Sequence, residues 1–532
     1  MMGKKGRRFL KFGITGGRQI LFFVWASWLS LCLPLFSQEE LQNYAYWAEL
    51  CESLTKAKQY DDAIQACDSA LALNGKDPLI WKLKGDVLLA QENYAKALAA
   101  YNQLLLLKPN QSIAQMGRCE AFFNLQQYQE AIASCESALQ IEENWEQTSP
   151  QRAWYFRGEA FQGLKQQENA LFSFDWAIKL QANYSPAWVG RCRLLLEEKK
   201  YEDALTACQT ARQNGASWDG FSPDLPWLYE GQIYNRLQKY DQAINVYEKA
   251  LASNPQDPIS WSEQAKILEE TGEYQQAWTA INWAINLSPN DSFALTQKCA
   301  ILNHLNQNEQ PAPEGDYSKA LESCDQALQK GNDRWGEFGS AYAWNQRGNA
   351  LIGLGKYSEA LVSLEQALSL QPDYGDAWNN RGVVLWYLEK YSEALKSIER
   401  AISINGDNSD AWFNKGSILV SLKQYQKAIT AYEQALSGDI NVRPPVAKAN
   451  ILINQSATFW RLQNYQQALI TAQNALELNP EKPSQINALY NKSLALVSLQ
   501  EYEQAIETLS ELLKIEPNHP QAQKLLKNLQ SP

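Results

Sequence analysis

The feature that most constrains this chain is a Tyr-x-x-Ala core that returns at intervals close to 34 residues. Its tyrosines are Tyr60, Tyr94, Tyr128, Tyr201, Tyr240, Tyr274, Tyr317, Tyr357, Tyr391, Tyr425, Tyr465 and Tyr502. A thirteenth core has Gln167 in place of tyrosine, and nine cores follow a tryptophan by thirteen residues, as Tyr94 follows Trp81. Each interval holds two apolar-periodic segments separated by a short polar turn, which predicts one helical hairpin per interval.

The stretch AWNQRGNALIGLGKYSEALVSLEQALSLQP, residues 343–372, resembles the tetratricopeptide repeat, whose pattern runs W-x2-L-G-x2-Y, A-x3-F and P. Counted from three residues before the tryptophan, the thirteen copies start at 44, 78, 112, 151, 185, 224, 258, 292, 341, 375, 409, 449 and 486. The resemblance implies an all-α fold, an α-solenoid in which about thirteen hairpins stack into a right-handed superhelix. Stacking is needed because one hairpin alone cannot bury its apolar face.

Insertions and composition divide the chain into four expected segments. They are a signal peptide or signal anchor at 1–37, a first block of about eight repeats at 44–334, a second block of five repeats at 341–519, and a capping helix at 520–532. The boundary between the blocks rests on NEQPAPEGD (308–316) and GNDRWGEFGS (331–340). Their Pro and Gly residues predict an exposed loop followed by a bend.

Charge is distributed unevenly between the N-terminal segment and the rest of the chain. The first 37 residues carry six basic side chains and no acidic one, and they end in an uncharged run from Gln19 to Ser37. This layout is typical of a secretory leader or signal anchor, and the alternative is a buried core helix. The first interpretation predicts an exported or membrane-anchored protein with the array on the extracytoplasmic side. The remaining 42 basic and 59 acidic residues disfavour a nucleic-acid partner.

Eight of the nine cysteines fall at positions 8 and 24 of four repeats, and no repeat has one without the other. The pairs are Cys51 with Cys67, Cys119 with Cys135, Cys192 with Cys208, and Cys299 with Cys324. Elsewhere position 8 is small and position 24 is large, as in Gly158 and Phe174. The two positions are therefore expected to face each other across the hairpin, within reach of a disulfide.

Export favours four disulfides, and reduced cysteines that fill the core are the alternative. Metal binding is disfavoured because His304 and His519, the two histidines of the chain, are not spaced as partners of these thiols. Redox catalysis is disfavoured because the chain has no C-x-x-C.

The sequence contains none of the motifs H-E-x-x-H, G-x-S-x-G or a phosphate-binding loop, and no interval remains for a catalytic domain. We therefore predict a non-catalytic scaffold, without a cofactor, that binds protein or extended-peptide partners in its concave groove. The alternatives are an accessory subunit of an envelope or polysaccharide enzyme complex, and a cytoplasmic adaptor.

The candidate binding residues lie in the last five repeats. Position 6, which faces ligands in the family that the repeat resembles, carries amides at Gln346, Asn380, Asn414, Asn454 and Asn491. This row is similar to the asparagine ladder of O-linked N-acetylglucosamine transferase, and an amide can donate to and accept from an extended peptide backbone. The alternative role of these residues is interhelical hydrogen bonding. Partner anchors are expected at Trp386, Tyr387, Trp460 and Arg461, with core packing as the alternative for the tryptophans.

Overall fold

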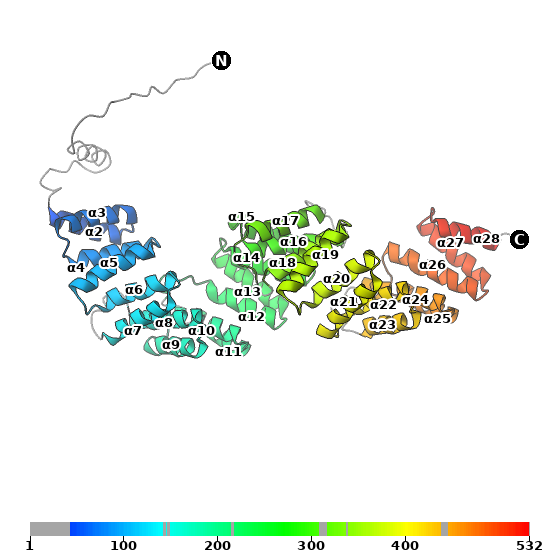
Figure 1. Cartoon of the computed structure of the whole chain (residues 1–532), viewed down its shortest axis with the longest axis horizontal. Coiled ribbons are helices and arrows are strands. Elements are labelled where there is room, and N and C mark those ends of the chain that lie inside the picture. The colour runs from blue at the N-terminus through cyan, green and yellow to red at the C-terminus, as the bar shows by residue number, and fades with distance from the viewer. Residues whose placement is uncertain are drawn as a thin grey trace, which may run out of the picture. The chain divides into compact units, whose positions relative to one another are not determined.

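The computed structural model describes residues 43–530 except 142–144, 146–148, 214–217, 308–316, 333, 337–338 and 438–444. The described residues form 27 helices and no strand, and consecutive helices pack as antiparallel pairs (Figure 1). The prediction of an all-α solenoid built from helical hairpins is confirmed. The predicted leader at 1–37 lies outside the described residues. No helix among those that are described has the length and apolar character needed to cross a membrane.

The chain divides into two compact units, of which one ends at Ile233 and the other begins at Tyr234. The first contains the hairpins α2 (Tyr44–Lys56) with α3 (Tyr60–Leu73), α4 (Pro78–Ala90) with α5 (Tyr94–Leu107), α6 (Ser112–Asn124) with α7 (Tyr128–Gln140), α8 (Pro150–Gly163) with α9 (Gln167–Leu180), and α10 (Ser185–Glu197) with α11 (Tyr201–Gln213). The division falls inside α12 (Leu225–Arg236).

The second unit continues the same arrangement from α13 (Tyr240–Ser253). Its further hairpins are α14 (Pro258–Glu270) with α15 (Tyr274–Leu287), α16 (Ser292–Gln307) with α17 (Tyr317–Lys330), α18 (Ser340–Gly353) with α19 (Tyr357–Leu370), α20 (Gly375–Tyr387) with α21 (Tyr391–Ile404), α22 (Ser409–Ser421) with α23 (Tyr425–Ser437), α24 (Pro445–Arg461) with α25 (Tyr465–Glu477), and α26 (Lys482–Ser498) with α27 (Tyr502–Ile515). The last helix, α28 (Pro520–Gln530), packs against α27.

Helix starts follow the repeat pattern closely. Every second helix begins at the predicted tyrosine, or at Gln167 in α9. First helices begin within one residue of the predicted starts, except α24 and α26, which begin four residues earlier. Each of these two helices has a proline in its first turn, Pro445 or Pro483, where the missing N–H leaves no hydrogen bond unmade.

A left-handed residue ends the first helix of each hairpin whose turn is described. In the first hairpin this residue is Lys58, with φ 59°, and Gln59 N donates to Leu54 O at 3.0 Å. This hydrogen bond is that of a Schellman cap, which satisfies a terminal carbonyl and turns the chain sharply. Among these described turns, glycine occupies the left-handed position only at Gly272 and Gly355, so the other described turns hold a side chain in a conformation that costs free energy.

Positions 8 and 24 face each other in the core, as the sequence predicts. A Cβ atom added to Gly158 would lie 2.6 Å from Phe174 Cε1, and one added to Gly85 would lie 2.7 Å from Tyr101 Cε1. Phe174 and Tyr101 are fully buried or nearly so. The large ring therefore fills the space that the missing side chain leaves, and the two helices approach closely.

The repeated tryptophan fastens the connection between neighbouring hairpins. Trp81 Nε1 donates to Gly75 O at 2.9 Å, and Trp412 Nε1 donates to Gly406 O at 2.8 Å. Trp188, Trp261 and Trp378 make the same bond six residues back. The tryptophans thus combine packing with a hydrogen bond that fixes the connecting turn.

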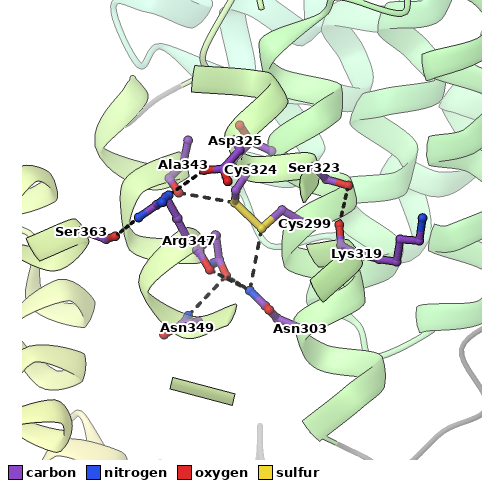
Figure 2. Close-up of a disulfide and its surroundings, with 12 residues drawn as sticks. Cys299, Asn303, Lys319, Ser323, Cys324, Asp325, Ala343, Arg347, Asn349 and Ser363 are labelled. Carbon is purple, nitrogen blue, oxygen red and sulfur yellow. Dashed lines mark hydrogen bonds and ion pairs between the residues drawn. A yellow bond between two sulfur atoms is a disulfide. The ribbon is translucent and has the colours of Figure 1, made fainter. Parts of the chain in front are cut away.

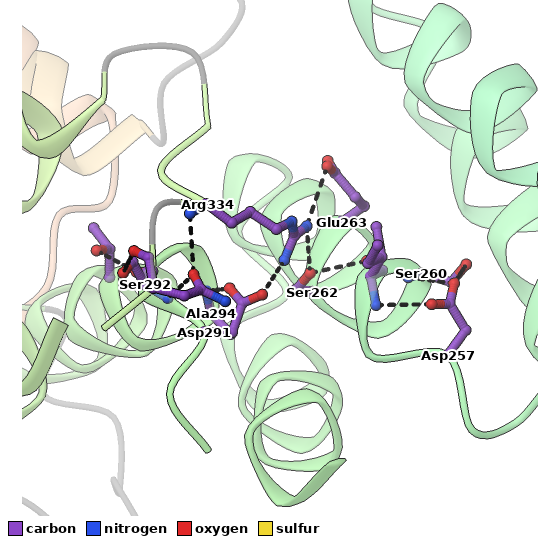
Figure 3. A network of polar contacts seen from close by, with 11 residues as sticks. Asp257, Ser260, Ser262, Glu263, Asp291, Ser292, Ala294 and Arg334 are labelled. Carbon is purple, nitrogen blue, oxygen red and sulfur yellow. Dashed lines mark hydrogen bonds and ion pairs between the residues drawn. The ribbon is translucent and has the colours of Figure 1, made fainter. Parts of the chain in front are cut away.

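The segment after α17, where the sequence predicts a bend, is tied to two first helices of the second unit (Figure 3). Arg334 Nη1 donates to Asp291 Oδ2 at 2.8 Å, and Nη2 donates to Ser262 Oγ at 3.1 Å. The guanidinium also lies 4.7 Å from the Phe293 ring centroid. The predicted division near residue 335 falls inside the second compact unit, and α17 and α18 on either side of it pack on each other. The boundary between the two sequence blocks stays a prediction.

Candidate partner-binding site

The amide row lies on the first helices of the second unit, and its side chains are half-buried or buried. Asn380 Nδ2 donates to Asn345 Oδ1 at 3.0 Å, and Asn414 Nδ2 donates to Asn379 Oδ1 at 2.9 Å. Each donor thus reaches the preceding repeat. Interhelical hydrogen bonding, the alternative role predicted for this row, therefore accounts for the NH2 groups of Asn380 and Asn414.

The last two asparagines of the row use backbone carbonyls instead. Asn454 Nδ2 donates to Asn450 O at 3.0 Å, within its own helix, and Asn491 Nδ2 donates to Ile453 O at 2.9 Å. Among the described residues, none donates to Oδ1 of Asn380, Asn414, Asn454 or Asn491. The NH2 groups therefore orient the amides, and the oxygens form a row of acceptors.

Gln346, the first residue of the predicted row, is 7% exposed and differs from the asparagines. Its Oε1 accepts from Asn303 Nδ2 at 3.2 Å and from Asn349 Nδ2 at 3.3 Å, near the Cys299–Cys324 disulfide (Figure 2). Both contacts occupy the amide oxygen. Gln346 consequently acts as a link between α16 and α18 rather than as an open acceptor.

The structure extends the row by one repeat that the sequence interpretation missed. Gln297 stands at position 6 of its repeat on α16, is 2% exposed, and has no hydrogen-bond partner for Oε1 among the described residues. Its signal was in the sequence, since it is an amide at the same position. It lies before the second sequence block at 341–519, to which the predicted row is confined.

The predicted anchors differ in how accessible they are. Trp386 Nε1 donates to Ser421 Oγ at 2.8 Å, and Trp460 Nε1 donates to Ser498 Oγ at 3.0 Å, so both indoles are fixed to the next repeat. Tyr387 is 48% exposed and stacks on Tyr357, with ring centroids 4.5 Å apart. Arg461 is exposed and its Nη1 donates to Ala457 O at 3.1 Å.

The first unit presents charges in place of amides. Arg152 on α8 forms an ion pair with Glu120 on α6 at 2.8 Å and with Asp219 at 2.8 Å. Asp219 belongs to an insertion between α11 and α12 and has φ 48°, and Tyr184 Oη donates to its Oδ2 at 2.9 Å. Burial raises the pKa of the Glu120 carboxyl even though Arg152 opposes this shift.

A second ion pair lies on the next first helices of this unit. Arg193 on α10 contacts Glu159 on α8 at 2.5 Å and donates from Nη2 to Gln162 Oε1 at 2.8 Å. Glu159 Oε1 has no hydrogen-bond partner among the described residues, although the side chain is 7% exposed. The sequence interpretation missed both ion pairs, because acidic side chains at helical spacing gave no signal distinct from a solvated face.

All four predicted cysteine pairs are joined in the structure. Their Cα atoms are 4.9, 5.1, 5.3 and 5.5 Å apart, in chain order. The nine-residue insertion before α17 lies between Cys299 and Cys324, so it lengthens that loop without changing the register. Within the described part of the chain, no group of three or more His, Cys, Asp or Glu residues has an arrangement that would hold a metal ion.

Helical hairpins that pack on their neighbours along the chain define an α-solenoid repeat protein. Tetratricopeptide repeat models match residues 82–147, 384–441, 341–374 and 459–529, and a TPR repeat model matches 231–272, together about half of the chain. The chain belongs to the tetratricopeptide repeat family. Tetratricopeptide arrays offer extended concave surfaces, and the class of function that this fold supports is protein–protein interaction.

The chain is similar to solved structures at low sequence identity. The APC/C hetero-tetramer Cut9-Hcn1 includes a chain that is 16% identical, with a TM-score of 0.53 over 92% of this chain and 97% of that one. A tetratricopeptide repeat protein from Parabacteroides merdae is 17% identical, with a TM-score of 0.39 over 52% of this chain and 98% of that one. No curated protein matches the chain.

Proposed function

We propose that this protein is a non-catalytic scaffold that holds an extended segment of a partner protein along the first helices α20, α22, α24 and α26. The observation that carries the proposal is the row of four asparagine oxygens that accept no hydrogen bond from described residues. Each asparagine is oriented by its own NH2 group. Backbone N–H groups of an extended peptide are donors that match such a row without regard to side chains.

Tyr387 supplies an accessible aromatic surface beside this row. It lies seven residues after Asn380 on α20, so the two side chains are on the same side of the helix. Because the ring is stacked on Tyr357, less side-chain freedom is lost when a partner packs against it. A segment gripped by the amides would therefore meet an ordered aromatic contact.

We further propose that the array works outside the cytoplasm or at a membrane surface. Four cysteine pairs within bonding geometry and the basic, then apolar, N-terminal sequence support this location. Alkylation of the denatured, unreduced native protein, followed by mass measurement, tests the oxidation state. We expect the eight paired cysteines to be unmodified, and eight accessible thiols would contradict the proposal.

Site-specific photocrosslinking in native extracts tests the binding face. A photoreactive residue at Tyr387 should capture a partner, whereas one at Val362 should not. Val362 is 58% exposed on α19, a second helix of the same unit, and it serves as the matched control. Capture at both positions, or at neither, would contradict binding along the first helices.

A further inference from the structure

The first unit contains a cavity of about 260 Å³ that involves neither the amide row nor its aromatic neighbours. It lies between α4, α6 and α8, and Asp219 from the segment before α12 also lines it. Its charged lining consists of Lys82, Asp86, Glu120, Arg152 and Asp219. Three carboxylates thus face two cations, and the wall has a net negative charge when all five are ionised.

The ion pairs with Arg152 leave lone pairs of Glu120 and Asp219 that could accept further hydrogen bonds. Arg152 engages both oxygens of Glu120 and Oδ2 of Asp219. Oδ1 of Asp219 accepts no hydrogen bond from the described residues, and this side chain is 34% exposed. An ionised carboxylate has about four acceptor sites, so Glu120 also has lone pairs beyond those that Arg152 uses.

The rest of the cavity wall is apolar. Leu89, Ile113 and Met116 line it, and the ring of Tyr101 is held there by its hydroxyl, which donates to Asp86 Oδ1 at 2.8 Å. Long basic side chains place a methylene stem along apolar surface and a charged head beside acceptors. The cavity offers both features at once.

We propose that this cavity binds a lysine or arginine side chain of the partner protein, with its charged head beside Glu120 and Asp219. We propose a cation because the lining has more carboxylates than basic groups, and an anionic side chain would add a fourth negative charge. Burial, which raises the pKa of Glu120, also means that a cation placed there would meet little screening from water. The inference rests on the proposed function, because it assumes a partner segment on the first helices.

The test uses a display library of random short peptides selected on the intact, disulfide-bonded protein. Peptides that depend on the first unit should share a Lys or Arg. In a synthetic copy of one such peptide, replacing that residue by norleucine should weaken binding about tenfold, as expected for loss of a charge-assisted hydrogen bond. The Asp219→Asn variant should lose a similar factor, and it preserves the turn because asparagine tolerates a positive φ.

The control variant is Asp203→Asn, which removes the same charge from an exposed position on α11 in the same unit. It should bind the peptide as the unmodified protein does. Selected peptides without a basic residue, or with affinity insensitive to Asp219→Asn, would overturn this inference and leave the proposed function standing. Recovery of no peptide at all would overturn both.

Discussion

The two units build the same hairpin and differ in how they fasten it and in what its first helix presents. Three of the five complete hairpins of the first unit are closed by a disulfide between positions 8 and 24. In the second unit only the α16–α17 hairpin has one, and the hairpins from α18 onward have none. The ion pairs Arg152–Glu120 and Arg193–Glu159 join neighbouring first helices of the first unit, and asparagine–asparagine hydrogen bonds join α18, α20 and α22 in the second.

This comparison separates two functions of the repeat. Positions 8 and 24 face the partner helix of the same hairpin, and a small residue beside a large one fills the space as well as a cysteine pair does. Position 6 lies on the first-helix face and carries amides in the last five repeats. In the first unit, Gly117 and Gly190 at this position pack against Tyr101 and Phe174, the rings at position 24 of the preceding repeats. The residue at position 6 therefore serves either hairpin stacking or the exposed face, depending on the repeat.

The largest expected difference between the units appears on reduction. Closing a loop of about 16 residues contributes roughly 3 kcal/mol through the unfolded state. A reductant should therefore lower the local opening free energy of the hairpins α2–α3, α6–α7 and α10–α11, and should leave α20–α27 unchanged. Amide hydrogen exchange with and without reductant measures this.

The double variant Cys119→Ala with Cys135→Ala provides the matched control for the first experiment. It should lose protection mainly in α6, α7 and their neighbours, because each hairpin of a solenoid contacts only the next ones. Equal loss of protection in both units on reduction would show that the disulfides do not account for the difference.

The next effect concerns hairpins without a disulfide. Gly158→Ala should lower the free energy of unfolding by about 1–3 kcal/mol, because the added methyl would overlap the buried Phe174 ring. Gly348→Ala should cost less, because its nearest atom is Leu364 Cδ2 at 2.8 Å, the end of a side chain that can rotate. Urea unfolding of the two variants gives the comparison. A larger cost for Gly348→Ala would contradict the packing explanation.

The periodic features of the fold could be predicted from the sequence, whereas the non-periodic ones could not. Tyr starts the second helix in twelve of the thirteen copies, and the cysteine pairs recur in register in four, so several copies support each assignment. Asp219 lies in an insertion, and its contact with Arg152, 67 residues away, has no repeated counterpart. The role of the asparagine NH2 groups depends on where the preceding helix lies, which a single position in a repeat does not specify.

A smaller effect tests the turns of the two units in the same way. Lys58→Gly in the first unit and Lys423→Gly in the second should each raise the free energy of unfolding by up to about 1 kcal/mol, because glycine adopts a positive φ without steric cost. Gly355→Ala should lower it by a similar amount. Urea unfolding measures all three, and stabilisation by Gly355→Ala would contradict the argument.

The smallest effect is the pH dependence that Glu120 gives to the first unit. The pKa of Glu120 is raised in the folded protein, so the folded state binds the proton more tightly than the unfolded state. Its contribution to stability is therefore present at low pH and is lost as the pH rises above the ordinary value for a glutamate. Glu120→Gln removes this dependence, and the variant should become more stable relative to the unmodified protein as the pH rises above the ordinary glutamate pKa of about 4. Urea unfolding of both proteins at several pH values measures how the difference in their free energies of unfolding changes with pH. The variant also weakens the Arg152 contact, but this cost is the same at each pH and does not alter the trend.

In the second unit Glu365→Gln alters an exposed ion pair with Arg381 and should show no such trend. A relative stability of Glu120→Gln that falls with rising pH would mean that Arg152, rather than burial, dominates this carboxylate.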